Sequence, residues 1–181
     1  ILELNHMALS MASYGSIAMF HVIGLAPEAP DWETASGGRS LVPEILSRSD
    51  LDAFYSEWSG QEEKLDVVAL ATPQLNMPEI VQIAELLDGR TVHPDTTLLV
   101  YTPIEIKEAC ARIGLNRTIE QAGGRMVHGH DFFATFAKEI REAHGWTRLM
   151  THSVKAVNIC EGYGYKPTPA SIPHCIESAI A

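Results

Sequence analysis

From residue 65 onward, short apolar runs alternate with longer amphipathic stretches, and this alternation restricts the fold more than any other feature. The run LDVVALA at 65–71 has the composition of a buried strand, and MPEIVQIAELLDG at 77–89 has the apolar spacing of a helix. Gly89 is suited to the end of that helix. The same order follows with TTLLVYT at 96–102 and PIEIKEACARIG at 103–114. Strands that alternate with helices in this way predict parallel βαβ units.

The remainder of the chain continues the pattern. We expect a short helix over 116–124, a strand over 125–130, a helix over 132–146, a strand over 147–151, a helix over 152–160 capped by Ser153, and a last helix over 171–181. Crossover helices cover both sides of a parallel sheet. The predicted fold class is therefore α/β, a mostly parallel sheet with helices on both faces.

Residues 1–60 lack this alternation. The apolar run at 17–26 contains His21 and Gly24 and is too short to cross a bilayer, so we expect a buried element in which His21 is a core histidine. Small residues and glycines within 11–30 would allow close backbone approach, as at a ligand or a neighbouring strand. Residues 40–60 have a helical pattern and are expected to form a covering layer.

The charge and the cysteines exclude several classes of protein. The chain carries 13 Lys and Arg against 23 Asp and Glu, a net charge of −10, so we expect no nucleic-acid partner. No apolar run is long enough to span a membrane, and no membrane partner is expected. The three cysteines show no C-x-x-C spacing, which favours reduced thiols and the cytoplasm, with Cys110 in the core. Ile1 in place of an initiator Met indicates a fragment.

Polar residues directly follow each expected strand. Ligands of parallel α/β sheets bind beyond the carboxyl ends of the strands, so these positions are candidates for a binding site. They are Thr72, Pro73 and Gln74 after the first strand, Thr102 after the second, His128 to Asp131 after the third, and Thr151 to Ser153 after the fourth. Turn chemistry or helix capping would account for any one of them alone. Their shared location favours a common site.

The segment AGGRMVHGHDFF at 122–133 places His128, His130 and Asp131 within four positions. Imidazole and carboxylate are usual ligands of zinc and non-haem iron. If the strand extends through this segment, alternation places His128 and His130 on one face. The alternative is a polar, solvated strand exit that happens to contain two histidines. The motif alone does not decide between these interpretations.

Several segments, in this order, together resemble the large catalytic domain of the aconitase X family. The most specific is SMASYGSIAMFHVIGLAPEAP at 10–30, which is similar to the family's FHV-x-G-x-x-PEAP signature. The others are SGG at 36–38, LDVVALATPQLNMPEI at 65–80, LLDGRTVHPDTTLLVYT at 86–102, AGGRMVHGHD at 122–131 and MTHSVKAVNI at 150–159. The resemblance spans nearly the whole chain.

The resemblance implies a part of a larger enzyme. Residues 1–181 would form part of one aconitase X-type catalytic domain, without its N-terminal half and without the small swivelling domain that closes over the substrate. The family's activity is hydro-lyase chemistry, the removal of water from a small hydroxy acid. The first motif looks closer to the bacterial branch, which favours cis-3-hydroxy-L-proline over phosphomevalonate as substrate. The family also uses an iron centre or an iron–sulfur cluster.

Two departures from the family concern this cofactor. Asp131 stands where the family has a cysteine, and Gln74 stands where it has a histidine. Carboxylate is a poor substitute for a thiolate in a cluster, so the resemblance implies mononuclear iron or zinc on His128, His130, Asp131 and Cys175, or loss of the metal. Cys175 lies at a position similar to that of a family cysteine.

The expected substrate contacts come from the matched segments, and no residue is assigned as the catalytic base. The expected contacts are Ser13, Gly15, Thr72, Thr151, Ser153 and Lys155. A cation beside hydroxyl donors suits a substrate carboxylate, although Lys155 would also fit a solvated helix surface. Two alternatives remain open because of Gln74 and Asp131. One is a diverged paralogue with another lyase or isomerase activity, and the other is a non-catalytic ligand-binding α/β subunit.

Overall fold

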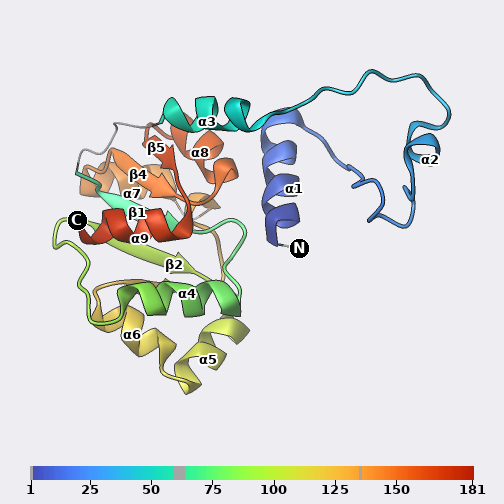
Figure 1. Ribbon diagram of the computed structural model, residues 1–181. Coiled ribbons are helices and arrows are strands. Elements are labelled where there is room, and N and C mark those ends of the chain that lie inside the picture. The colour runs from blue at the N-terminus through green and yellow to red at the C-terminus, as the bar shows by residue number, and fades with distance from the viewer. Residues whose placement is uncertain (1, 59–63, 135) are drawn as a thin grey trace.

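Five parallel strands form the centre of the molecule in the computed structural model, which describes residues 2–58, 64–134 and 136–181 (Figure 1). The strands are β1 (Val67–Leu70), β2 (Thr97–Tyr101), β3 (Arg125–Val127), β4 (Arg148–Thr151) and β5 (Lys166–Pro169). They lie in the order β3-β2-β1-β4-β5, and every neighbouring pair is parallel. The predicted α/β class and parallel sheet are confirmed.

The strand order reverses between β1 and β4. From β1 the chain moves outward through β2 to β3, and it then returns to place β4 on the other side of β1. The segments that leave the carboxyl ends of β1 and β4 therefore run to opposite sides of the sheet. In open parallel sheets, such a switch point opens the crevice in which ligands bind.

Helices cover the sheet on both faces, as the sequence predicts. They are α4 (Met77–Leu87), α5 (Ile104–Arg112), α6 (Leu115–Gln121), α7 (Ala137–His144), α8 (Val154–Gly162) and α9 (Ile172–Ile180), with a 3-10 turn η1 (Phe132–Ala134) before α7. Val68 and Leu70 of β1 belong to a core that includes Ile80 of α4 and Ile176 of α9. Val67 and Ala69 join a second core that includes Cys160 of α8. Because successive strand residues point to opposite faces, β1 is buried on both.

The first turns of α4 and α8 are fixed by their caps. Asn76 accepts a hydrogen bond from the backbone N–H of Glu79, and the Glu79 carboxylate accepts one from the backbone N–H of Asn76 at 2.9 Å. Ser153 caps α8 through the backbone N–H of Ala156, as predicted. Such caps stabilise a helix start by about 1 kcal/mol each. They also fix the residues that follow β1 and β4.

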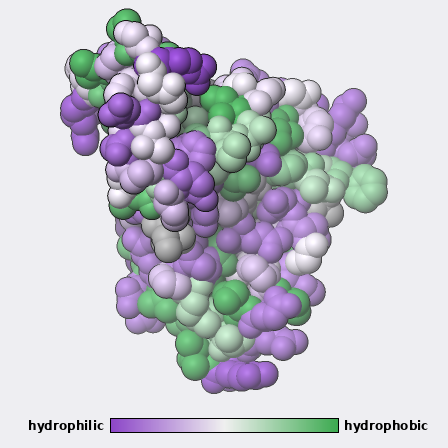
Figure 2. Space-filling view, turned by 90° about the vertical axis from the view of Figure 1, so that its right-hand side faces the viewer, coloured by the Kyte–Doolittle hydropathy of each residue, from purple (hydrophilic) through white to green (hydrophobic). Residues whose placement is uncertain are grey.

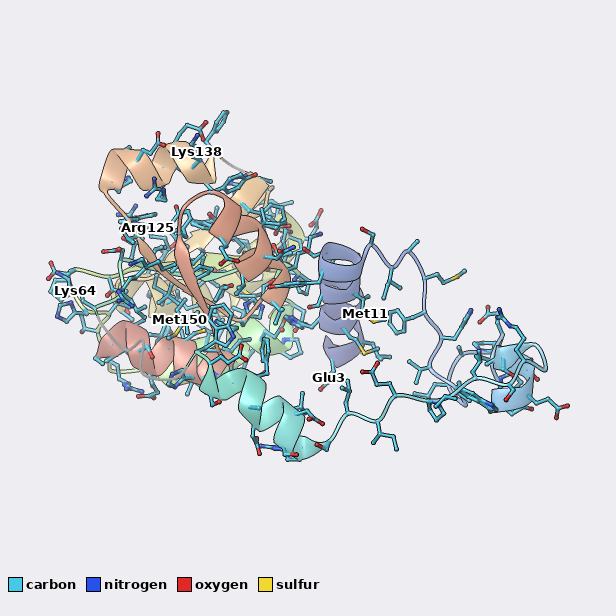
Figure 3. All side chains as sticks on the ribbon, turned by 90° about the horizontal axis from the view of Figure 1, so that it is seen from above. Glu3, Met11, Lys64, Arg125, Lys138 and Met150 are labelled. Carbon is cyan, nitrogen blue, oxygen red and sulfur yellow. The ribbon has the colours of Figure 1, made fainter. Side chains whose placement is uncertain are left out.

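The N-terminal residues differ from the sequence expectation. Helix α1 (Leu2–Gly15) is followed by an arm, residues 16–47, that contains only the short helix α2 (Trp32–Ser36) and leads to α3 (Arg48–Ser56). Seen from above, α1 with Glu3 and Met11 lies between the sheet and the arm (Figure 3). The expected buried element at 17–26 is wrong, since it contains no helix or strand and Met19 is 75% exposed. His21 is exposed as well, because the arm extends away from the core.

The expected helix over 40–60 is also mostly wrong. Only α3 forms within it, and residues 59 and 60 lie outside the described part of the chain. Val42 is 95% exposed and Ile45 is 84% exposed, so this segment does not act as a covering layer. Figure 2 views the molecule from the side of the arm and shows hydrophobic side chains on the surface.

Two further differences concern the edge strands. Strand β3 ends at Val127, so His128 and His130 lie in the following turn and not on the strand. Strand β5, with the sequence KPTP, was not expected from the sequence because it contains two prolines. Proline cannot donate to a strand ladder, but it is tolerated at the edge, where β5 pairs only with β4. The expected helix over 132–146 is divided between η1 and α7, with residue 135 outside the described residues.

Candidate functional site

A cleft of about 990 Å³ opens beside the switch point of the sheet. Its walls come from α1, from the end of α3, from the first turns of α4 and from the segments that follow β4 and β5. The polar side chains that line it include His6, Ser10, Glu79, Gln82, His152 and His174. The cleft is thus where the fold would place a ligand.

Three of these side chains meet in one group. His6 extends from α1, Glu79 is held by the cap of α4, and His152 lies between β4 and α8. The His6 Nε2 atom is 3.9 Å from Glu79 Oε1, and the two imidazole ring centroids are 5.0 Å apart at an interplanar angle of 72°. One ligating atom from each residue lies within 4.8 Å of the other two.

The surroundings set the charge of this group. Burial lowers the pKa of His152 to about 4, with a smaller effect from His6, so its imidazole is neutral near pH 7. Both His152 nitrogens are buried without a hydrogen-bond partner. Burial alone would raise the pKa of Glu79, but His6 and the backbone N–H of Asn76 outweigh it and hold that pKa below its usual value. A carboxylate therefore faces a neutral imidazole.

This arrangement supports two kinds of chemistry. Two imidazoles and a carboxylate are a common ligand set for a divalent metal ion. A carboxylate and a neutral imidazole in a cleft can also accept protons from a bound substrate. Among the described residues, these three form the one group of at least three His, Cys, Asp or Glu side chains with ligating atoms so close together.

The threonines and the serine expected to contact substrate lie at the strand ends, as predicted, but they do not line the cleft. Thr151 accepts a hydrogen bond from the backbone N–H of Ser153 at 3.2 Å, and Ser153 is occupied as the cap of α8. Thr72 is buried with φ of 61°, and its Oγ1 atom has no hydrogen-bond partner. A left-handed conformation is unusual for threonine. Substrate contact by these residues stays a prediction.

The remaining expected contacts surround α8. Ser13 and Gly15 belong to the last turn of α1. The Asn158 amide donates to the Ser13 hydroxyl at 2.8 Å and so fixes α1 to α8. The Lys155 ammonium lies 5.7 Å from the centre of the Phe133 ring, and Lys155 does not line the cleft. Substrate contact by Ser13, Gly15 and Lys155 also stays a prediction.

The metal ligands expected from the sequence are arranged differently. His128 and His130 are exposed, and Gly129 between them has φ of 88°, so strand alternation does not place them on one face. The Gln74 amide donates to the backbone carbonyl of His130 at 3.1 Å. Gln74 and Asp131, the two positions at which the resemblance implies a departure from the family pattern, therefore lie in one region. The described residues do not gather His128, His130, Asp131 and Cys175 into a ligand group, and metal binding by them stays a prediction.

The described cysteines do not fit a cluster held by thiolates. Cys110, Cys160 and Cys175 are buried and form no disulfide, and each lies inside a helix. Burial raises the pKa of Cys110, of Cys175 and, to about 12, of Cys160. Cluster ligation needs deprotonated thiols grouped around one space. No two of these cysteines occur in a ligand group among the described residues.

His6 and Glu79 were not identified from the sequence, and His152 was included only as part of the strand-end segment Thr151 to Ser153, without a role of its own. His152 lies between Thr151 and Ser153, directly after β4, so inspection of the residues that follow each strand includes it. Glu79 is visible in the sequence as the acidic partner of the Asn76 cap. His6 carries no local signal, because only the packing of α1 across the sheet edge brings it to the other two residues.

The fold and the cleft define the class of the chain: an α/β domain with a cleft beside the switch point of a parallel sheet. Residues 65–181 match the family model described as the aconitase X third domain. The chain belongs to the aconitase X family, and the resemblance noted in the sequence is confirmed. No helix within the described residues combines the length and the apolar character needed to cross a membrane.

Relatives and a solved structure agree with this assignment. The chain is 31% identical over 176 residues to a cis-3-hydroxy-L-proline dehydratase of Pseudomonas aeruginosa, a match that covers 94% of the chain and 30% of the relative. It is 29% identical to the phosphomevalonate dehydratase large subunit of Methanothermobacter thermautotrophicus, with 88% of the chain and 38% of the relative covered. The chain thus spans well under half the length of these relatives.

The fold is shared with the holo-form of aconitase X from Thermococcus kodakaraensis. The TM-score is 0.79 at 22% identity, and the match covers 99% of this chain and 44% of that chain. The fold of the present chain is therefore found within a larger chain.

Proposed function

We propose that the protein containing this chain is a hydro-lyase that removes water from a small hydroxy acid, and that this chain forms one wall of the active site. The observation that carries the proposal is the position of His6, Glu79 and His152 in the cleft beside the switch point. The dehydratase names of its relatives support the reaction class.

The preferred substrate is cis-3-hydroxy-L-proline, followed by phosphomevalonate. The hydroxyproline dehydratase of Pseudomonas aeruginosa matches 94% of the chain, against 88% for the phosphomevalonate dehydratase large subunit. Both compounds are acids with a hydroxyl group on the second carbon from the carboxylate. The cleft residues would therefore promote the same reaction, loss of water from a hydroxy acid, with either compound.

Dehydration of such an acid breaks one C–H bond and one C–O bond. A base takes the proton from the carbon beside the carboxylate, the electron pair forms a C=C bond, and hydroxide leaves with a proton as water. The ionised Glu79 is the base that the site offers, and the capping bond to Asn76 holds it in one orientation. The neutral imidazole of His152 is placed to hydrogen-bond the departing hydroxyl group.

The cofactor and the compartment belong to the same proposal. Membership of the aconitase X family points to a metal or iron–sulfur cofactor in the whole protein, and the described cysteines of this chain do not supply cluster ligands. The three cysteines are buried and form no disulfide, which fits a reducing compartment. The compartment that we propose is the cytoplasm.

Exposed apolar side chains on the arm support the proposal that it contacts another part of the protein. Val42 and Ile45 are almost fully exposed, and the chain covers 30% of its Pseudomonas relative. Apolar groups exposed in this way mark surfaces that pack against other parts of a protein. The arm then contacts the missing parts of the catalytic domain and the swivelling domain, whether these belong to the same chain or to another subunit.

Turnover by the complete protein tests the proposed function. The purified protein is incubated with cis-3-hydroxy-L-proline and, separately, with phosphomevalonate, and the loss of substrate is followed by mass spectrometry as a decrease of one water. We expect turnover of at least one compound, with cis-3-hydroxy-L-proline preferred. No turnover of either compound, with iron or zinc supplied, would overturn the proposal and favour a diverged paralogue or a ligand-binding subunit.

A further inference from the structure

We infer that His6, Glu79 and His152 bind one divalent transition-metal ion, either zinc or ferrous iron, at the switch point of the sheet. This site is separate from the exit of β3, where the sequence predicts metal ligands. The inference deepens the proposed function by adding a Lewis acid to its cleft, and it rests on that function only for the role of the ion. With the ion bound, Glu79 and His152 act as its ligands, whereas in the metal-free site they are the base and the hydrogen-bond donor of the proposed reaction.

The geometry of the three side chains fits a single small ion. One ligating atom of each residue lies within 4.8 Å of the other two, and His6 Nε2 is 3.9 Å from Glu79 Oε1. In a tetrahedral site with ligand bonds of about 2.0–2.2 Å, neighbouring ligand atoms are about 3.3–3.6 Å apart. Small rotations of His6 and His152 about their side-chain bonds are therefore enough to close the site around an ion.

His152 supplies an independent indication of a missing partner. Both of its ring nitrogens are enclosed, yet neither has a hydrogen-bond partner. A buried polar group without a partner costs about 1–3 kcal/mol, so such groups are rare in folded proteins. A metal ion bound to one nitrogen would supply the partner that this nitrogen lacks. The other residues of the group point to the same space, since the His6 ring meets His152 edge to face.

The charge of the cleft favours a cation. Glu3 and Glu79 line it, and no lysine or arginine is found among the described lining residues. A bound dication would be partly neutralised by the Glu79 carboxylate, which the cap of α4 already holds in place. An anionic ligand, by contrast, would meet two carboxylates and no lysine or arginine, unless a metal ion were already bound in the cleft.

The donor types determine the class of metal. Two imidazoles and one carboxylate suit zinc and ferrous iron, whereas magnesium and calcium prefer oxygen ligands alone. Three protein ligands also leave at least one position open for water or for a substrate oxygen. That open position would face the cleft. The ion would then lie beside the carboxylate or hydroxyl group of a bound hydroxy acid.

Metal titration of the complete protein tests the inference without any substrate. After removal of metal with a chelator, Zn²⁺ is titrated calorimetrically, Fe²⁺ is titrated under anaerobic conditions, and Co²⁺ binding is followed by visible absorption. The ligand variants are His6→Ala, Glu79→Gln and His152→Ala. Glu79→Gln keeps an oxygen that can accept the Asn76 capping bond. His6 is partly exposed, so His6→Ala reports on metal binding even if His152→Ala fails to fold.

The matched control is His174→Ala, because His174 lines the same cleft but does not belong to the ligand group. A second comparison is the double variant His128→Ala with His130→Ala. Substitution of a residue that only hydrogen-bonds to a metal ligand changes metal affinity by about 10 to 100-fold. Loss of a direct ligand should therefore weaken binding by at least about 100-fold. We expect this loss in His6→Ala and Glu79→Gln, and wild-type affinity in both comparison proteins.

Two outcomes would overturn the inference. One is wild-type affinity in His6→Ala and Glu79→Gln, with loss in the His128 and His130 double variant, which would place the ion at the exit of β3. The other is weak binding without a defined stoichiometry, which would indicate an adventitious ion only. Neither outcome depends on turnover, so failure of the metal site and failure of the proposed hydro-lyase activity are distinguishable.

Discussion

At the scale of single residues, the three cysteine side chains are the clearest test of what this chain can do with a metal. All three are buried, and burial raises their pKa values. We expect none of them to react with a maleimide in the native protein over several minutes, because the thiolate is the reactive form. All three should react after unfolding in urea. Rapid labelling of Cys175 in the native protein would show that it is available to a metal, contrary to this structure.

A buried hydroxyl group permits a second test. Tyr165 donates a hydrogen bond from its hydroxyl to the backbone carbonyl of Ala137 at 2.9 Å, within the core between α7 and α8. Tyr165→Phe leaves that carbonyl without its donor, so we expect a loss of about 1 kcal/mol in the free energy of unfolding. Urea unfolding measures the change. Tyr14→Phe, at a position 57% exposed, is the control and should unfold like the wild type.

The sequence pointed to one residue of the cleft group, His152, and not to the other two. Parallel α/β topology directed attention to the residues after each strand, and His152 is one of those residues. Hydroxyl groups and Lys155 were expected to contact substrate, but Ser153 caps α8 and Lys155 lies near the ring of Phe133. His6 could not be predicted, since its role depends on how α1 packs against α8, a contact between residues far apart in the sequence.

At the scale of elements, the packing of α6 against the sheet depends on a residue without a side chain. A Cβ atom on Gly124 would lie 2.8 Å from Ile119 Cγ2 and 3.1 Å from the Ile119 carbonyl oxygen. We therefore expect Gly124→Ala to lower the free energy of unfolding by about 1–3 kcal/mol through overpacking. The measurement is the shift of the urea unfolding midpoint.

Gly162 is the matched control for this prediction. It lies in the last turn of α8, and a Cβ atom added there would meet open space, with no neighbouring side chain within 4 Å. Alanine also favours the helical conformation, so Gly162→Ala should be neutral or stabilising by up to about 1 kcal/mol. Equal destabilisation by both substitutions would mean that the packing of Gly124 is not as the structure has it.

Most elements of the sheet region were predicted because their local patterns and their tertiary roles agree. The run that forms β1 is apolar throughout, as a strand buried on two faces requires, and the run that forms β2 is mostly apolar. Helix α4 begins and ends at the residues its caps indicate. Strand β5 was missed because its residues have low strand propensity, and only pairing with β4 makes it a strand. The arm was misjudged because its apolar residues were assigned to a core that this chain does not contain.

At the scale of the whole molecule, that exposed arm predicts contacts with the rest of the protein. Ile45 is 84% exposed here, and burial of an isoleucine side chain stabilises a protein by about 1.5–3 kcal/mol. We expect Ile45→Asp to lower the melting temperature of the complete protein, measured by calorimetry. Arg48→Ala, at a side chain 86% exposed, is the control and should melt like the wild type. An unchanged melting temperature for Ile45→Asp would mean that the arm stays exposed in the complete protein.

In the proposed function, dehydration occurs in the cleft beside the switch point. The most direct test of this claim is the rate constant kcat for cis-3-hydroxy-L-proline in the complete protein carrying Glu79→Gln, compared with His144→Ala, whose side chain is exposed at the end of α7 and does not line the cleft. Positioned acid–base groups contribute about 10²–10⁴-fold, so we expect kcat to fall by at least about 100-fold in Glu79→Gln and to stay within about threefold of the wild type in His144→Ala. A Glu79→Gln protein that is correctly folded and turns over substrate at the wild-type rate would contradict the claim.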